Sequence, residues 1–195
     1  MNRKLIALSA ALIIMGMVTG CAATAQLSDA GAGASFSDGD FQVAEIAASD
    51  RGKPVQFEGI TETGETVTSD DYLGEVLVVN FWYAACGPCI VEAPMLEEVF
   101  QRFQDTGVDF LGVNTYDQAE TALSFARENK VTYPSIIDVN DGQVKLAFAQ
   151  LPPIQATPTT LVIDRQGRLA ARIIGQLPSA SILSTIVADT LAEAP

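Results

Sequence analysis

Apolar residues are arranged along this chain in two ways, as an unbroken run and as a helical stripe. The segment Val76–Trp82 is apolar and rich in β-branched residues, with Asn80 as its polar exception. Such a run is typical of a strand that is covered on both faces of a sheet. After it, four large apolar residues recur at the i, i+3, i+4 and i+7 spacing of one helical face: Leu96, Val99, Phe100 and Phe103. The pattern predicts a buried central strand followed by an amphipathic helix.

The same order of elements continues along the chain. Val108–Val113 reads as the next strand, and Asp117–Glu120 resembles a capping box that opens a helix through about Asn129. A strand–helix–strand–helix order predicts parallel strands joined by a right-handed crossover.

Two predicted hairpins and a closing helix flank this unit. The hairpins pair Val55–Ile60 with Glu65–Val67, and Thr160–Asp164 with Leu169–Ile174, each around a turn that contains glycine. The closing helix is marked by an apolar stripe at Ile182, Leu183, Ile186, Val187 and Leu191. We therefore expect an α/β fold, with a central mixed sheet flanked by helices and an N-terminal β-hairpin extension.

The start of the chain has the three parts of an export signal. Met1–Lys4 is positively charged, Leu5–Val18 is largely apolar, and Thr19–Cys21 provides small residues for cleavage. As a helix, the apolar part spans only about 21 Å, whereas the hydrocarbon core is roughly 30 Å thick. We expect residues 1–20 to be a signal peptide that is removed.

The segment Val18–Cys21 resembles the bacterial lipobox, in which the cysteine becomes the lipidated first residue of the mature chain. The sequence has three cysteines, and a pair formed by Cys86 and Cys89 leaves Cys21 without a partner. Lipidation of Cys21 explains the odd cysteine. An ordinary secretory signal that contains a cysteine is the alternative.

Residues 21–50 are mostly small and polar, so we expect a flexible tether there and a folded domain over 51–195. Phe41, Val43 and Ile46 are apolar enough to form a short strand at the edge of that domain.

Composition excludes several function classes. The sequence contains no histidine, which rules out His-dependent triads and His-ligated metal sites. The formal net charge of −13 argues against nucleic acid as a partner. We expect no cofactor and no bound metal, and we interpret the acidity as a solvated surface.

Cys86 and Cys89 stand between the predicted buried strand and the amphipathic helix. Two intervening residues on a first helical turn bring the sulfurs within disulfide reach, and Pro88 fits that turn because its missing N–H costs little there. The free N–H groups at the helix start stabilise a thiolate on Cys86, which we expect to be exposed. One alternative is that the two cysteines form half of a zinc site, which would need two further ligands. The other is a structural disulfide, but a disulfide that closes so short a loop constrains little of the unfolded chain.

Two separated segments carry a family resemblance. Asn80–Pro94 surrounds the cysteines and Ala156–Asp164 follows farther on. In this order they closely resemble the thioredoxin-like family of exported thiol-disulfide reductases that includes TlpA, ResA and CcmG. The resemblance covers residues 51–195 and implies a thioredoxin-like fold.

The resemblance also implies roles for single residues. Cys86 would be the attacking thiolate and Cys89 the resolving thiol, and together they would form the redox disulfide. Pro158 would be a cis-proline that faces the cysteines. Thr157 before it would offer backbone hydrogen bonds to the chain of the partner.

Gly87 and Pro88 would form the active-site loop, with Trp82 packed beneath it. Glu92, one helical turn after the second cysteine, would move the proton of that cysteine; an ordinary exposed helical glutamate is the alternative. Asn80 occupies the place where cytosolic thioredoxins carry a buried aspartate, which makes Glu92 the better proton acceptor.

The chain departs from the family beside both cysteines. The family often has tryptophan before the first cysteine and a basic residue after the second, whereas this sequence has Ala85 and Ile90. We expect a more apolar and less positive rim, which leaves the client and the pKa of Cys86 open.

These observations predict an extracytoplasmic thiol-disulfide oxidoreductase that is anchored to the bacterial cell membrane through Cys21. The Gly–Pro pair between the cysteines favours reduction of disulfides in exported proteins, with electrons from a membrane thiol donor. Maturation of apocytochrome c is one role that the family implies. We expect a monomer.

Three other functions are alternatives. A disulfide oxidase or isomerase differs only in reduction potential and electron partner. A Cu(I) chaperone would hold the metal between two thiolates, but the copper-handling relatives use a histidine. A thiol peroxidase carries a Pro-x-x-x-Thr-x-x-Cys pattern, which is missing around Cys86.

Overall fold

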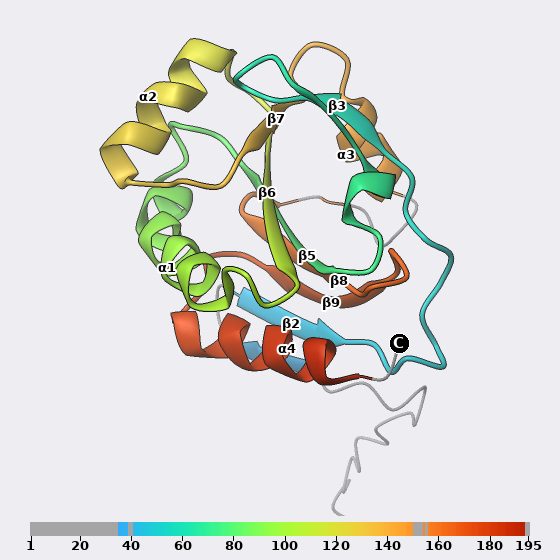
Figure 1. The fold of residues 1–195 in the computed structure, drawn as a ribbon. Helices are drawn as coiled ribbons and strands as arrows, with labels where there is room; N and C mark the ends of the chain where they lie inside the picture. The colour runs from blue at the N-terminus through green and yellow to red at the C-terminus, as the bar shows by residue number, and fades with distance from the viewer. Residues whose placement is uncertain (1–34, 39–40, 150–153, 155, 194–195) are drawn as a thin grey trace, which may run out of the picture. The chain divides into compact units, whose positions relative to one another are not determined.

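Figure 1 shows the chain in a computed structural model, which describes residues 35–38, 41–149, 154 and 156–193. The predicted signal peptide, Cys21 and much of the expected tether lie outside the described residues. Within the described ranges, no helix combines the length and the apolar character that a membrane crossing requires.

A mixed sheet organises the fold. Its strands among the described residues are β1 (Ser35–Asp38), β2 (Phe41–Glu45), β5 (Val76–Trp82), β6 (Val108–Asn114), β7 (Ser135–Ile137), β8 (Thr159–Ile163) and β9 (Leu169–Ile174). They lie in the order β1-β2-β9-β8-β5-β6-β7. The central strand β5 pairs parallel with β6 and antiparallel with β8. The expected mixed sheet and the parallel βαβ unit are confirmed.

Helices cover both faces of this sheet (Figure 1). They are α1 (Gly87–Phe103), α2 (Ala119–Asn129), α3 (Gln143–Phe148), α4 (Ala180–Ala192) and a short 3-10 helix, η1 (Ser69–Tyr72). Because successive side chains of a strand point to opposite faces, β5 contributes to two cores. Val76 and Val78 pack with residues of α1 and α4, whereas Leu77, Val79 and Phe81 pack with residues of α3. Every residue of β5 is buried, as the apolar run predicted.

The N-terminal hairpin pairs β3 (Glu58–Ile60) with β4 (Thr66–Thr68) in antiparallel register. Beyond β3, Thr61 forms a bridge to Ile136 of β7, so the hairpin reaches the edge of the main sheet. Strands β1 and β2 come earlier in the chain, and β2 pairs with β9. The sheet therefore takes in residues that the sequence assigned to the tether.

The predicted capping box at Asp117 is wrong. Helix α2 begins at Ala119, and the residue before it, Gln118, makes no side-chain capping bond. The reason is a tight turn in which Asn114 Oδ1 accepts hydrogen bonds from the N–H groups of Tyr116 and Asp117. This turn leaves the Asp117 carboxylate bonded to the N–H of Ala84 instead.

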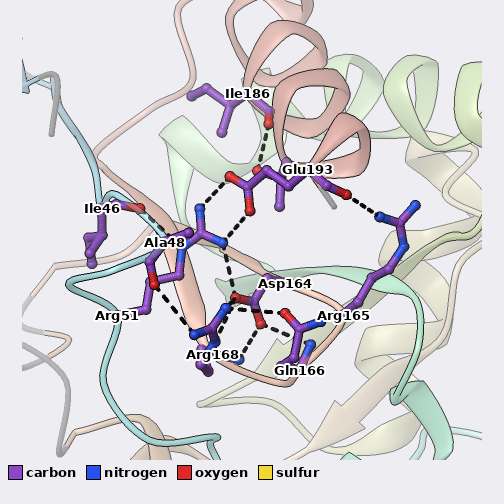
Figure 2. A network of polar contacts seen from close by, with 10 residues as sticks. Ile46, Ala48, Arg51, Asp164, Arg165, Gln166, Arg168, Ile186 and Glu193 are labelled. Atoms are coloured by element: carbon purple, nitrogen blue, oxygen red, sulfur yellow. Dashed lines mark hydrogen bonds and ion pairs between the residues drawn. The ribbon is translucent and has the colours of Figure 1, made fainter. Parts of the chain in front are cut away.

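Arg51 links the start of the folded region to two later elements, as Figure 2 shows. Its guanidinium donates to the Ile46 carbonyl, to Asp164 at 3.0 Å and to both carboxylate oxygens of Glu193. Asp164 is also bonded by Arg168, and its side chain is only 3% exposed. Hydrogen bonds from Arg168 and Arg51 outweigh the effect of burial and lower the pKa of Asp164.

Candidate active site

The cysteines lie where the central strand gives way to α1. Cys86 is the N-cap of this helix, and its Sγ accepts a hydrogen bond of 3.2 Å from the N–H of Cys89. The two sulfurs form a disulfide, with the Cα atoms 5.2 Å apart. Pro88 lies in the first helical turn, as predicted, and that turn contains no acidic residue. The helix start therefore favours a negative charge on a freed Cys86 sulfur.

The expectation that Cys86 is exposed is wrong for this disulfide state. Cys86 is 3% exposed and Cys89 is 2% exposed. Both belong to a small apolar cluster with Trp82, Ala93 and residues of α2. The side chain is covered because Cys86 faces the second sulfur and the loop before β8.

Trp82 packs against this cluster, as predicted. Its ring lies 4.4 Å from that of Phe125 between centroids, and its Nε1 donates to Ser135 Oγ at 3.2 Å. The indole is 6% exposed. It therefore serves as a support for the disulfide and offers almost no surface to a partner.

Pro158 follows a cis peptide bond after Thr157. The carbonyl oxygen of Thr157 lies 3.9 Å from Cys86 Sγ. A disulfide sulfur carries no hydrogen, so this is a packing contact. The predicted proximity of the proline loop and the cysteines is present, and the loop leads directly into β8.

Glu92 is buried on the inner face of α1, with 1% exposure. Its Oε1 accepts from Asn80 Nδ2 at 2.8 Å, and its Oε2 accepts from the N–H of Leu177 at 2.9 Å. Asn80 also donates to Thr160 Oγ1 at 3.1 Å. Burial raises the pKa of Glu92 to about 7, against the opposing effect of these hydrogen bonds. The alternative of an ordinary exposed glutamate is excluded.

Within the described residues, Glu92 makes its hydrogen bonds to Asn80 and Leu177 and none to a cysteine sulfur. The same part of the chain holds no group of three or more Cys, Asp or Glu side chains that is arranged for a metal ion.

Sequence reasoning missed the supporting role of three polar residues, one of which, Asp117, it had assigned to a capping box. Asp117 and Asn114 fix the turn before Cys86, and Ser135 holds the indole of Trp82. An Asn at the end of a strand, three residues before an Asp, is a signal for the turn. Nothing in the sequence signals the contact of Ser135.

The rim around the disulfide is apolar, as the departures from the family predicted. Ala85 is exposed, and Ile90 and Val91 are 44% and 55% exposed. Tyr116 is 74% exposed, and its ring lies 5.7 Å from that of Tyr83.

Comparison with known proteins agrees with this geometry. The chain is 34% identical over 112 residues to a thiol-disulfide oxidoreductase ResA from Geobacillus thermodenitrificans, covering 57% of this chain and 62% of that protein. It is 27% identical over 119 residues to ResA from Bacillus subtilis, covering 61% of this chain and 64% of that protein. The chain thus spans less than two thirds of the length of these curated relatives.

Solved structures have the same fold. A DsbF homologue from Corynebacterium diphtheriae superposes with a TM-score of 0.65 at 26% identity, over 75% of this chain and 92% of that one. A secreted thiol-disulfide isomerase from Corynebacterium glutamicum gives a TM-score of 0.69 at 24% identity, over 83% and 99% of the two chains. The thioredoxin-like fold and the resemblance to ResA are confirmed. Residues 51–172 match the AhpC/TSA family, and the chain belongs to that family.

Proposed function

We propose that this chain is a membrane-anchored, extracytoplasmic thiol-disulfide oxidoreductase that reduces disulfides in exported proteins. The observation that carries the proposal is the disulfide between Cys86 and Cys89 at the N-terminus of α1, beside cis-Pro158. The relatives named ResA and the DsbF homologue support the same chemistry.

The proposed reaction runs through a mixed disulfide. In the reduced chain, the Cys86 thiolate attacks one sulfur of a client disulfide, and the other client sulfur leaves as a thiolate. Cys89 then loses its proton and attacks Cys86 Sγ, which releases the second client thiolate. The client gains two electrons, and the chain ends in the disulfide of this structure. A thiol donor at the membrane would return the two electrons to the pair.

Glu92 is the proposed acceptor of the Cys89 proton. A carboxyl group with a pKa of about 7 is partly ionised at neutral pH, so it is able both to take up a proton and to release it. Asn80 and the Leu177 N–H fix its orientation. Thr157 would offer its backbone to the client chain next to Cys86.

The direction of electron flow is the finer part of the proposal. The Gly87–Pro88 pair, as in reducing thioredoxins, is the basis for choosing reduction. About 30 mV corresponds to 1.4 kcal/mol, so a few hydrogen bonds to the thiolate decide the direction. Apocytochrome c is one client class that the resemblance implies. The peroxidase pattern is missing around Cys86, and peroxide reduction is not part of the proposal.

Trapping experiments test the assigned roles. Cys89→Ala is expected to accumulate mixed disulfides with exported proteins, because the resolving thiol is gone, whereas Cys86→Ala is expected to trap none. Equal trapping by both variants contradicts the assignment. Acid-quenched alkylation in intact cells then shows the direction of electron flow. Mostly reduced Cys86 and Cys89 support a reductase, and a mostly oxidised pair supports an oxidase.

Anchoring through Cys21 needs its own measurement. The wild-type chain is expected to enter the detergent phase in a phase-partitioning assay, and Cys21→Ser is expected to remain in the aqueous phase. Aqueous partitioning of both would refute the lipid anchor while leaving the redox proposal intact.

A further inference from the structure

A groove of about 1050 Å³ lies apart from the disulfide, on the side of the molecule that carries α3 and the β3–β4 hairpin. One wall is the hairpin segment 58–64, and the other is the segment 138–147, which includes most of α3. Ile136 and Val144, both buried, form part of its lining. The site proposed for thiol exchange does not use this groove.

Both walls are held in place by contacts within the chain. Gly59 packs so closely that a Cβ atom there would lie 2.6 Å from Ile136 Cγ2. Next to it, Glu62 Oε2 accepts from the N–H of Ser135 at 2.7 Å. Gln118 Nε2 donates to Asn140 Oδ1 at 3.0 Å, which joins the start of α2 to the opposite wall. A groove that is already formed does not require its walls to be ordered on binding.

The lining combines apolar anchors with negative charge. Ile60 on one wall and Leu146 on the other are 58% and 61% exposed. Glu58 and Asp141 are exposed acids in the lining. Within the described residues, no lysine or arginine lines the groove, and Lys145 of α3 lies outside the lining. Lys145 interacts electrostatically with Asp138, whereas Glu58 and Asp141 make no ion pair among the described residues. Apolar anchors beside these two unpaired acids fit an extended segment with aliphatic and basic side chains.

The groove continues from the loop that borders the redox pair. Gln118 in the lining follows Asp117, whose carboxylate holds the N–H of Ala84 at 2.6 Å, two residues before Cys86. Tyr116 of the same loop contacts Tyr83. A protein chain that reaches Cys86 is therefore able to extend over this loop toward the groove.

We propose that the groove is a second docking site for the disulfide-bearing client, and that it binds a client segment with basic and large aliphatic residues. The proposal rests on the proposed function, since it supplies the client specificity of the same reaction. It explains how a redox pair with an apolar rim selects among exported proteins: the rim tolerates many sequences, and the acidic groove favours those with a basic segment.

Two matched probes test the proposal with the reduced full-length chain. Each is a synthetic peptide with a mixed disulfide to a chromophoric thiol, followed by a short segment of alternating Lys and Leu in one probe and of Glu and Ser in the other. We expect the Lys/Leu probe to react about ten-fold faster, with a preference that falls at higher ionic strength. The paired variants Ile60→Ser with Leu146→Ser, and Glu58→Gln with Asp141→Asn, are expected to remove most of this preference.

The controls use residues outside the lining. Leu73 is exposed like the apolar anchors, and Glu65 lies on the same hairpin as Glu58. Leu73→Ser and Glu65→Gln are expected to keep the preference, and all variants are expected to react equally with a small aromatic disulfide. An unchanged preference in both groove variants overturns the proposal.

A disulfide-free Lys/Leu peptide separates this proposal from the redox function. Its binding, followed by fluorescence anisotropy, is expected to weaken in the groove variants even where no thiol exchange is detected. If the peptide does not bind while thiol exchange proceeds normally, the docking proposal is refuted and the proposed redox function is not affected. Self-association of the chain that Ile60→Ser abolishes would also overturn the proposal, in favour of a second copy as occupant.

Discussion

The carboxylate of Asp117 accepts a hydrogen bond from the backbone N–H of Ala84, 2.6 Å away. The same oxygen accepts from Asn114 Nδ2 at 3.0 Å, and Asn114 is fully buried at the end of β6. The loop between β6 and α2 is thereby fastened to the turn that ends in Cys86. A side chain outside the cysteine motif thus holds the backbone two residues before Cys86 against the loop that follows β6.

Asp117→Ala is expected to lower both stability and reactivity. The substitution leaves the Ala84 N–H and the Asn114 amide without an acceptor, which costs about 1–3 kcal/mol of unfolding free energy. We expect slower thiol exchange although the cysteine motif itself is unchanged, because the turn before Cys86 loses the hydrogen bond that holds it. Urea unfolding and the exchange rate with a model disulfide measure the two effects. Asp189→Ala, at an exposed position of α4, is the control; equal behaviour of the two variants would contradict the anchoring role.

Gly112→Ala tests the support beneath the disulfide. A Cβ at Gly112 would overlap Ser135 Oγ and lie 2.8 Å from Trp82 Nε1, so the bond between these side chains has to give way. We expect a loss of about 1–3 kcal/mol from overpacking. Trp82 is the single tryptophan of the sequence, so its fluorescence reports the displacement directly. Gly52→Ala meets no atom within 4 Å and is the control; an unchanged emission spectrum in Gly112→Ala would show that the indole does not depend on this packing.

The parts of the fold that the sequence predicts are those with long, regular patterns. Strand β5 has seven buried residues and α1 has seventeen residues, long enough for the unbroken apolar run of the strand and the period of the helix to be recognised. Strand β7 has three residues and α3 has six, too few for a hydrophobic period. Both are stabilised by contacts with distant segments, such as the bridge between Ile136 and Thr61.

The candidate site likewise has residues that the sequence predicts and residues whose roles depend on distant contacts. The spacing of Cys86, Cys89 and Glu92 places these residues on one helix, and the family resemblance adds Pro158. Burial of Glu92 is not readable from the helix, because its hydrogen-bond donor Leu177 lies 85 positions later in the chain. The role of Asp117 is likewise set by the turn at Asn114, which competes with the capping box that the local sequence favours.

Arg51→Ala is expected to destabilise the fold and to make it more sensitive to acid. Removing the guanidinium leaves Asp164 buried with fewer partners, although Arg168 and two backbone N–H groups remain bonded to it. We expect the free energy of unfolding to fall by about 2–3 kcal/mol. This is at or below the range for breaking a buried ion pair, because Asp164 keeps its other partners. Arg51→Lys keeps the positive charge but loses the forked guanidinium, so its stability should lie between those of the wild type and Arg51→Ala.

The pH dependence follows from the lowered pKa of Asp164. Its ionised form contributes stability above the unfolded pKa, and this contribution is lost as the pH falls through the lower folded value. Without Arg51 the folded pKa rises, so the acid-unfolding midpoint should move to higher pH. Arg127→Ala, which removes an exposed arginine bonded to Ser124, should leave the acid-unfolding midpoint unchanged. A shift of the same size in this control would show that the effect does not come from the buried contacts of Arg51 with Asp164.

Glu92 gives the opposite pH dependence, because burial raises its pKa from 4.5 to about 7. Below the unfolded pKa the carboxyl is protonated in both states. Between the two pKa values only the folded state binds the proton, so stability falls as the pH rises and levels off above about 7. The total change is roughly 3 kcal/mol, from 1.36 kcal/mol for each pKa unit.

Glu92→Gln isolates this contribution. Asn80 and Leu177 donate to different oxygens of Glu92. A protonated glutamate and a glutamine each keep one carbonyl oxygen as a strong acceptor, so both weaken one of the two bonds, and the variant should match the wild type in stability at low pH. As the pH rises, the variant should become the more stable protein by roughly 3 kcal/mol, because it has no buried charge to form. Urea unfolding of the oxidised proteins across this pH range measures the difference, with Glu128→Gln on the exposed side of α2 as control. A difference that stays constant with pH would mean that Glu92 is ionised without penalty in the folded state, and it would then be a poor acceptor for the Cys89 proton.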